Sequence, residues 1–192
     1  MAYIGMRYPV AAQVSSHTDG SAITYGTGFV VSSAVAATVN ITSNESKDYG
    51  DDIVKDTDNG ITGYNISLET NDLPVASLVG LMGWVPDNQT TPTKYDMTGD
   101  AAPLVGFGYI RVKRNAGVLS YETFWFHKCR FTPASMEART KEENITWQHP
   151  TITAEGQGCY IDSSGKPKFA EYMLHASEAA AKTWLNSRAN IT

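Results

Sequence analysis

Histidine, cysteine and carboxylate side chains are the groups in this chain that could bind a metal or transfer a proton, and their spacing favours neither chemistry. His127 and Cys129 lie two residues apart on one predicted strand and so share a face, but a metal site there would need ligands from other elements. We expect a packed pair. The sequence contains no His-Glu-x-x-His motif, no Gly-x-Ser-x-Gly elbow and no phosphate-binding P-loop. These observations predict no enzyme, no metal and no cofactor.

Two partial motifs also fail on detail. The segment that starts at Asp56 begins like an EF-hand loop, but Gly60 is fifth rather than sixth and Ser67 stands where a bidentate Glu should be. The segment from Val105 to Val112 resembles the RNA-recognition octamer, but valine replaces both its leading basic residue and its final aromatic residue. Neither segment predicts a ligand.

Cys129 and Cys159 share no Cys-x-x-Cys spacing, and we expect two buried thiols in a reducing compartment. A disulfide between them is the alternative. The N-terminal residues lack the basic and apolar regions of a secretory signal. No apolar run approaches the roughly 20 residues that cross a bilayer, so we expect no membrane span.

Length and composition predict a single domain over residues 1–192. The chain is 42% hydrophobic and 18% charged, which suits a packed core and argues against intrinsic disorder. Its net charge of −5 argues against a protein that coats DNA, because phosphate binding needs clustered Lys and Arg.

Alternation of apolar and polar residues with a period of two predicts half-buried antiparallel strands. A helix over 73–82 has Asp72 as its expected N-cap and Gly83 after its end, and a C-terminal helix over 177–187 has Ser177 as its N-cap. The pattern predicts a mainly β protein with antiparallel strands, a helix that packs on a sheet, a long loop and a C-terminal helix. The predicted strands are 7–14, 27–32, 35–42, 61–69, 93–98, 104–114, 117–131, 144–154 and 158–162.

Charge is distributed unevenly along the chain. Residues 45–58 hold six acidic residues against Lys47 and Lys55, inside a predicted loop over about 43–60. The loop is either a partner-binding segment or a solvated connection. The predicted hairpin is basic, with five basic residues against Glu122 between residues 105 and 130. Opposite charges of this kind could meet between copies of the chain, in a head-to-tail contact that closes into rings or propagates as a filament.

Several segments spread over the chain together carry a resemblance to a known family. They are Tyr3-Ile-Gly-Met-Arg-Tyr-Pro-Val, Tyr25-Gly-Thr-Gly, Asp58-Asn-Gly-Ile-Thr-Gly-Tyr, Pro103-Leu-Val-Gly-Phe-Gly-Tyr-Ile-Arg-Val-Lys-Arg, Phe124-Trp-Phe-His-Lys, Gly165-Lys-Pro-Lys-Phe and Glu178-Ala-Ala-Ala-Lys-Thr-Trp-Leu-Asn-Ser. Through them the chain resembles, nearly end to end, the major tail proteins of long-tailed, non-contractile bacteriophages of Gram-positive hosts.

The resemblance implies an antiparallel β-sandwich or half-barrel of the tail-tube type, with one flanking helix, a long loop and a C-terminal helix. It also implies a structural subunit of the virion tail, assembled in the host cytoplasm. Six copies would form a ring in which one sheet of each joins a continuous barrel. Stacked rings would form the tube through which DNA passes without specific binding. The partners that the resemblance implies are other copies of the chain, the tape measure protein, the tail terminator and baseplate proteins. The alternative is a β-sandwich module of the tail, either an adhesion module or a baseplate component, that contacts the host surface.

Two sets of residues are assigned on this basis. We expect the acidic loop to make the ring-to-ring contact and to be mobile in the free subunit. We expect the basic residues Arg111, Lys113 and Arg114 to face subunit interfaces or the exterior, with an acidic or neutral lumen. The candidate contact residues of the loop are Asp48, Tyr49, Asp51, Asp52, Ile53, Val54, Asp56 and Asp58.

Overall fold

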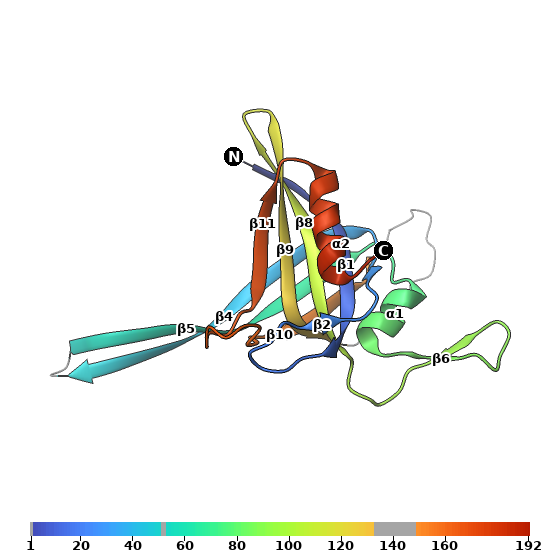
Figure 1. The fold of residues 1–192 in the computed structure, drawn as a ribbon, viewed down its shortest axis with the longest axis horizontal. Coiled ribbons are helices and arrows are strands. Elements are labelled where there is room, and N and C mark those ends of the chain that lie inside the picture. Colours follow the sequence, from blue (N-terminus) through green and yellow to red (C-terminus); the bar gives the residue numbers. More distant parts are fainter. Residues whose placement is uncertain (1, 51–52, 133–148) are drawn as a thin grey trace, which may run out of the picture.

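One antiparallel sheet dominates the fold (Figure 1). The structure, a computed structural model, describes residues 2–50, 53–132 and 149–192. The larger sheet has the order β2-β1-β8-β9-β10-β5-β4, with β3 paired to β1 and β11 paired to β9, and β6 and β7 form a small separate sheet. The strands are β1 (Ala2–Ser16), β2 (Thr24–Tyr25), β3 (Phe29–Val30), β4 (Ala34–Gly50), β5 (Ile53–Thr70), β6 (Val85–Asp87), β7 (Lys94–Asp96), β8 (Leu104–Asn115), β9 (Val118–Phe131), β10 (Thr151–Gln157) and β11 (Ala170–His175); the helices are α1 (Val75–Met82) and α2 (Glu178–Ala189).

The hairpin of β8 and β9 is the centre of the sheet, and it confirms the predicted pair of long strands. Its turn places Ala116 and Gly117 at φ values of 47° and 86°, the positive values that a two-residue turn between twisted strands requires. On the side away from β8, β9 pairs with β11 over residues 121–126 and with β10 over residues 129–131. The half nearer the turn is therefore a four-stranded unit, β1-β8-β9-β11, which we call the blade.

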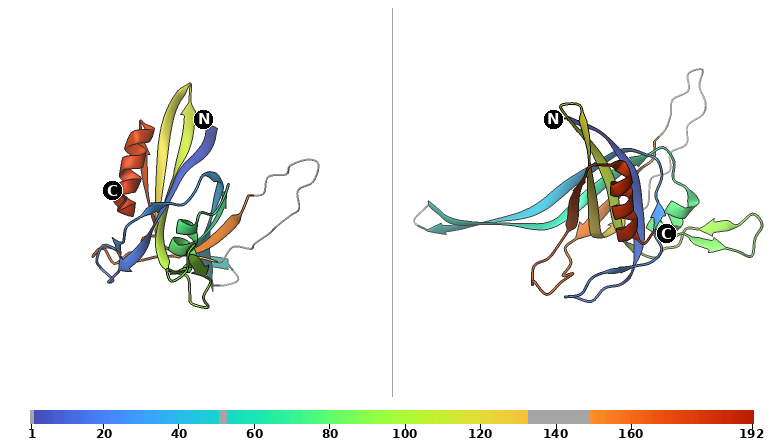
Figure 2. Two further views of the ribbon diagram at one scale, coloured as in Figure 1. Left: turned by 90° about the vertical axis from the view of Figure 1, so that its right-hand side faces the viewer. Right: turned by 45° about the horizontal axis from the view of Figure 1, so that its top comes forward.

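Helix α2 packs on one face of the blade (Figure 2, left). Ala181, Leu185 and Ala189 follow one another at helical spacing and are fully buried, against residues that include Ile110 and Trp125. Gly108 permits this approach, because a Cβ there would lie 2.8 Å from the Leu185 side chain. The Ser177 side chain accepts a hydrogen bond from the Ala180 amide, which confirms the predicted N-cap.

The second core lies on the opposite face of the β8–β9 hairpin, at the end remote from its turn. Phe107 and Phe131 contact one another there at a ring distance of 5.6 Å, and Ile66, Leu68 and Leu81 are buried in the same cluster. These residues come from β8, β9, β5 and α1, so the half of the molecule remote from the hairpin turn is a two-layer sandwich. The expected fold class, mainly β with antiparallel strands and flanking helices, is confirmed.

Three local predictions are wrong. Helix α1 starts at Val75 rather than after Asp72. Leu73 precedes Pro74, and a residue before proline disfavours helical dihedral angles. The Asp72 carboxylate accepts a hydrogen bond from the Ser32 hydroxyl instead of capping the helix. Residues 158–162 form no strand, only one bridge from Cys159 to Lys168. The segment 43–60 was predicted as a loop, but residues 43–50 belong to strand β4 and residues 53–60 to strand β5. Residues 144–148 of the predicted strand 144–154 lie outside the described residues.

Candidate assembly interface

The acidic segment forms a two-stranded projection that leaves the body of the molecule (Figure 1). We call it the arm and define it as residues 43–50 of β4 and 53–60 of β5. Asp48 pairs with Asp56, and Tyr49 pairs with Val54 at its end. The structure thus brings together five of the candidate contact residues at the end of the arm and places the backbone of a sixth, Asp58, opposite Ser46. Asp51 and Asp52 lie outside the described residues. The five are Asp48, Tyr49, Ile53, Val54 and Asp56.

The surface of the arm is poorly suited to remaining in water alone. Tyr49 is 65% exposed and Ile53 and Val54 are exposed beside it, although aromatic and β-branched side chains gain free energy from burial. Asp48 and Asp56 are directly opposite one another, an arrangement of like charges that destabilises a strand pair. A two-stranded hairpin without a packed layer is marginally stable in water. These features favour a surface that is completed by a partner.

Arg111 and Lys113 of the β8–β9 hairpin lie on the blade face opposite α2, whereas Arg114 lies on the α2 side. Arg111 donates from Nε and Nη2 to Glu122 Oε2 at 2.9 and 2.6 Å, and Lys113 Nζ lies 3.3 Å from Glu122 Oε1. The Arg111 guanidinium also stacks 4.0 Å from the ring centre of Tyr3. Arg114 is exposed beside the turn. Two of the three predicted basic residues therefore neutralise a carboxylate of their own chain.

This ion cluster was missed from the sequence, although its signal was present. The two-residue turn at Ala116 and Gly117 fixes the register of the hairpin, so Arg111 must pair with Glu122 across the strands. The Glu122 side chain is only 3% exposed. Burial by itself raises the pKa of Glu122, but hydrogen bonds and charge from Arg111, with a further hydrogen bond from Lys113, outweigh burial and leave the pKa below its usual value.

Glu122→Gln is expected to lower the free energy of unfolding by about 2 kcal/mol, because it leaves two cations on the blade without their carboxylate. Denaturant unfolding at pH 7 measures the change. The matched control is Glu45→Gln, which removes an exposed pair with Lys47 at 2.8 Å and should change stability by less than about 0.5 kcal/mol. Equal effects of the two substitutions would contradict a structural role for the cluster.

The blade has an open strand edge on each side. Among the described strands, residues 2–9 of β1 pair with β8 alone, and β11 pairs with β9 alone. Tyr3 and Ile4 are exposed at the first edge, and Tyr172, Met173 and Leu174 are exposed at the second. Unpaired edges with apolar side chains are prone to pair with another chain.

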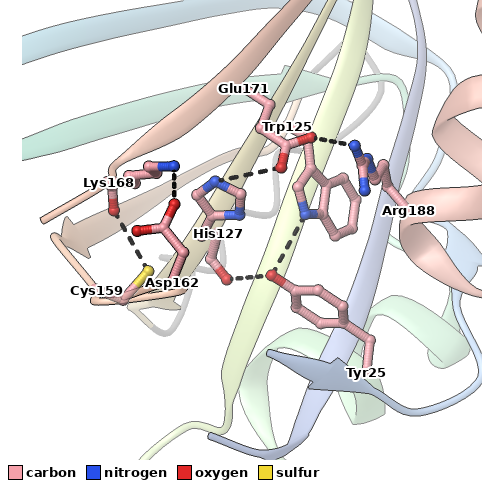
Figure 3. A network of polar contacts seen from close by, with 8 residues as sticks. All are labelled: Tyr25, Trp125, His127, Cys159, Asp162, Lys168, Glu171 and Arg188. Atoms are coloured by element: carbon pink, nitrogen blue, oxygen red, sulfur yellow. Dashed lines mark hydrogen bonds and ion pairs between the residues drawn. The ribbon is translucent and has the colours of Figure 1, made fainter. Parts of the chain in front are cut away.

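Between α2, β11 and β9 lies a partly buried polar network (Figure 3). The Tyr25 hydroxyl donates to the His127 carbonyl at 2.7 Å and lies 3.3 Å from Trp125 Nε1. Glu171 of β11 binds Arg188 of α2 at 2.7 Å, and its other oxygen is 3.8 Å from His127 Nε2. The His127 Nε2 atom is buried without a hydrogen-bond partner among the described residues. Sequence reasoning could not find this network, because its members come from four separate elements and carry no common motif.

The predicted sharing of a face by His127 and Cys129 is wrong. The register shifts between the pairs Val105–Cys129 and Phe107–Phe126, so a β-bulge inserts one extra residue in β9. His127 therefore lies with Trp125 on the α2 side, whereas Cys129 joins Phe126 in the sandwich core.

The chemistry available at these groups is limited by their burial. Both cysteines are buried free thiols, as predicted. Burial raises the pKa of Cys129 and of Cys159, so neither thiol is a ready thiolate. In the part of the chain that the structure describes, no three His, Cys, Asp or Glu residues are grouped so as to hold a metal ion.

The molecule is an antiparallel β protein with an exposed arm, two open blade edges and an ion cluster around Glu122. A comparison with known proteins finds no family model and no curated sequence that matches the chain. None of the helices formed by the described residues has both the length and the apolar character needed to cross a membrane.

Proposed function

We propose that this chain is a structural subunit of a phage tail tube, which assembles into sixfold rings that stack around a channel for DNA. The observation that carries the proposal is the pair of open edges on one four-stranded blade. Every pairing within β1-β8-β9-β11 is antiparallel, so β1 and β11 run in opposite directions. Joining β11 of one copy to β1 of the next therefore continues one antiparallel sheet from copy to copy.

Such a contact is heterologous, because different surfaces of the two copies meet, and it closes into a ring or propagates. Closure would remove the strand edges that otherwise invite aggregation. Helix α2 packs on one face of the blade (Figure 2) and contacts both edge strands through side chains, Arg7 of β1 with Glu178 and Glu171 of β11 with Arg188. Among the described strands, none pairs with the outer edge of β11 or with that of residues 2–7 of β1. The sequence resemblance to major tail proteins supplies the sixfold symmetry, the stacking and the tape measure, terminator and baseplate partners of the proposal. The arm is then the element that reaches the next ring.

Negative-stain microscopy of the concentrated protein, combined with light scattering for mass, tests the proposal. Rings of six copies, or tubes, are expected across moderate salt and pH. A strictly monomeric protein that forms no polymer even with tail initiator components would contradict it. A monomer or trimer that binds glycans would instead indicate a module that contacts the host surface.

Assembled tubes are expected to release duplex DNA readily. A channel that retained phosphates would gain counterion-release free energy at every contact and stall the genome. The net charge of −5 acts against retention, and Glu122 already offsets one of the two positive charges of Arg111 and Lys113. Filter binding of duplex DNA to tubes at low salt is the measurement. Tight retention that weakens steeply with salt would contradict the prediction.

A further inference from the structure

The turn end of the blade carries an exposed surface that no described element covers. Val118 is 70% exposed and Leu119 is exposed beside it, and the first residues of β1 add exposed Tyr3 and Ile4. Tyr3 pairs with Lys113 and Leu119 pairs with Arg114, so an apolar side chain lies beside each cation, Lys113 on the face opposite α2 and Arg114 on the α2 side of the hairpin. We call this surface the basic tip, and it comprises Tyr3, Ile4, Lys113, Arg114, Val118 and Leu119.

The basic tip and the end of the arm are complementary in chemistry. Each presents exposed aromatic and aliphatic side chains, Tyr49 with Ile53 and Val54 on the arm and Val118 with Leu119 on the tip. Their charges have opposite signs. Residues 111–122 of the hairpin hold three basic residues and one acidic residue, Glu122. The described part of the arm holds four acidic residues and two lysines.

Within one molecule the two surfaces point in different directions. Figure 1 shows the arm leaving the body at the lower left and the turn of the β8–β9 hairpin at the top, and the right view of Figure 2 agrees. A contact between them therefore needs two copies of the chain. The unfavourable pair of Asp48 and Asp56 supports the same conclusion, because opposing cations would relieve its repulsion.

We infer that the arm of one copy docks on the basic tip of a second copy. The inference rests on the proposed function, since it names the surface of the neighbouring subunit that receives the arm. Tyr49, Ile53 and Val54 bury their apolar surface against Val118 and Leu119. Asp48 and Asp56 face Arg114, which shares its side of the hairpin with Leu119. Association is then fastest at low ionic strength, because salt screens attraction between exposed charges.

Charge exchange tests the contact. Asp56→Lys removes the like-charge pair with Asp48, and Arg114→Glu alters a side chain outside the Glu122 cluster, so neither should unfold the chain. Each single variant is expected to slow tube growth about tenfold, and the double variant should recover most of the wild-type rate. Met97→Ala, which removes an exposed apolar side chain elsewhere, is the matched control.

Cross-linking places the contact directly. Tyr49→Cys protein mixed with Val118→Cys protein should give disulfide-linked dimers on oxidation of the polymer, whereas Tyr49→Cys with Met97→Cys should not. Tubes that grow at the wild-type rate in both charge variants and give no cross-link would overturn the inference and leave the proposed function standing. A wild-type chain that forms neither rings nor tubes would overturn both.

Discussion

Replacing residues 47–57 with Asn-Gly is expected to abolish tube growth while the body of the protein keeps its fold. The replacement closes the hairpin at the pair Ser46–Asp58, and Asn-Gly supplies the positive φ values that a two-residue turn needs. The described side chains that the replacement removes belong to neither buried core. The free energy of unfolding should therefore change by less than about 1 kcal/mol, whereas polymer mass by light scattering should fall to background.

Circular dichroism and thermal unfolding verify that the shortened protein is folded. Thr57→Ala, which leaves the charged and apolar side chains of the arm in place, should polymerise like the wild type. If the shortened protein grows tubes at an unchanged rate, the arm has no part in assembly. If it fails to fold, the arm contributes to the body in a way that its exposure does not indicate.

The arm also shows how a strand can be missed by pattern reasoning. Alternation of apolar and polar residues reports one buried and one solvated face, and it correctly predicted 35–42 and 61–69, where β5 covers the core with Ile66 and Leu68. Beyond those segments both faces of the ribbon are solvated, so the sequence has no reason to alternate. Acidic residues, which are depleted in strands, then indicated a loop. The residues that gather at its end were still predicted, because they are neighbours in the sequence.

Strand β11 was missed for a related reason. Tyr172, Met173 and Leu174 are consecutive apolar residues, and all three are exposed at an edge, so they lack the period of a half-buried strand. Helix ends were more predictable, because capping depends on local chemistry: Ser177 caps α2, and Gly83 ends α1 with a φ of 75°. Contacts between distant elements, such as Glu171 with Arg188, have no local signal at all.

Acidification is expected to destabilise the fold through His127, starting below about pH 6.5. Burial lowers the pKa of His127 to about 4, and the positive charges of Arg188 and Lys168 act in the same direction. Glu171 does not reverse this effect, because its nearer interaction is with Arg188 at 2.7 Å. The unfolded chain therefore binds a proton near pH 6.5, whereas the folded chain excludes it until about pH 4. Stability is unaffected above this window and falls within it, by about 3 kcal/mol in total.

Other groups titrate in the same range, so the effect must be isolated by difference. The pKa values of Glu122 and Glu178 are lowered in the folded state, and their contributions to stability are also lost as the pH falls. His127→Gln removes only the histidine's share, and exposed His149→Gln is the matched control. Denaturant unfolding at intervals from pH 7 to pH 4 should show a shallower loss for His127→Gln, by about 3 kcal/mol, and an unchanged loss for His149→Gln.

A titration of the His127 ring by NMR provides an independent measure of the same quantity. Its protons should stay at their neutral chemical shifts until the pH approaches 4, since the buried Nε2 atom has no acceptor within hydrogen-bonding distance among the described residues to stabilise a bound proton. Parallel stability curves for the wild type and His127→Gln, or a His127 pKa near 6.5, would contradict the prediction. Glu171 would then leave Arg188 and bind the protonated His127 ring instead. Protonation of His127 would then neither weaken nor strengthen the attachment of β11, because its pKa would be the same in the folded and unfolded chains.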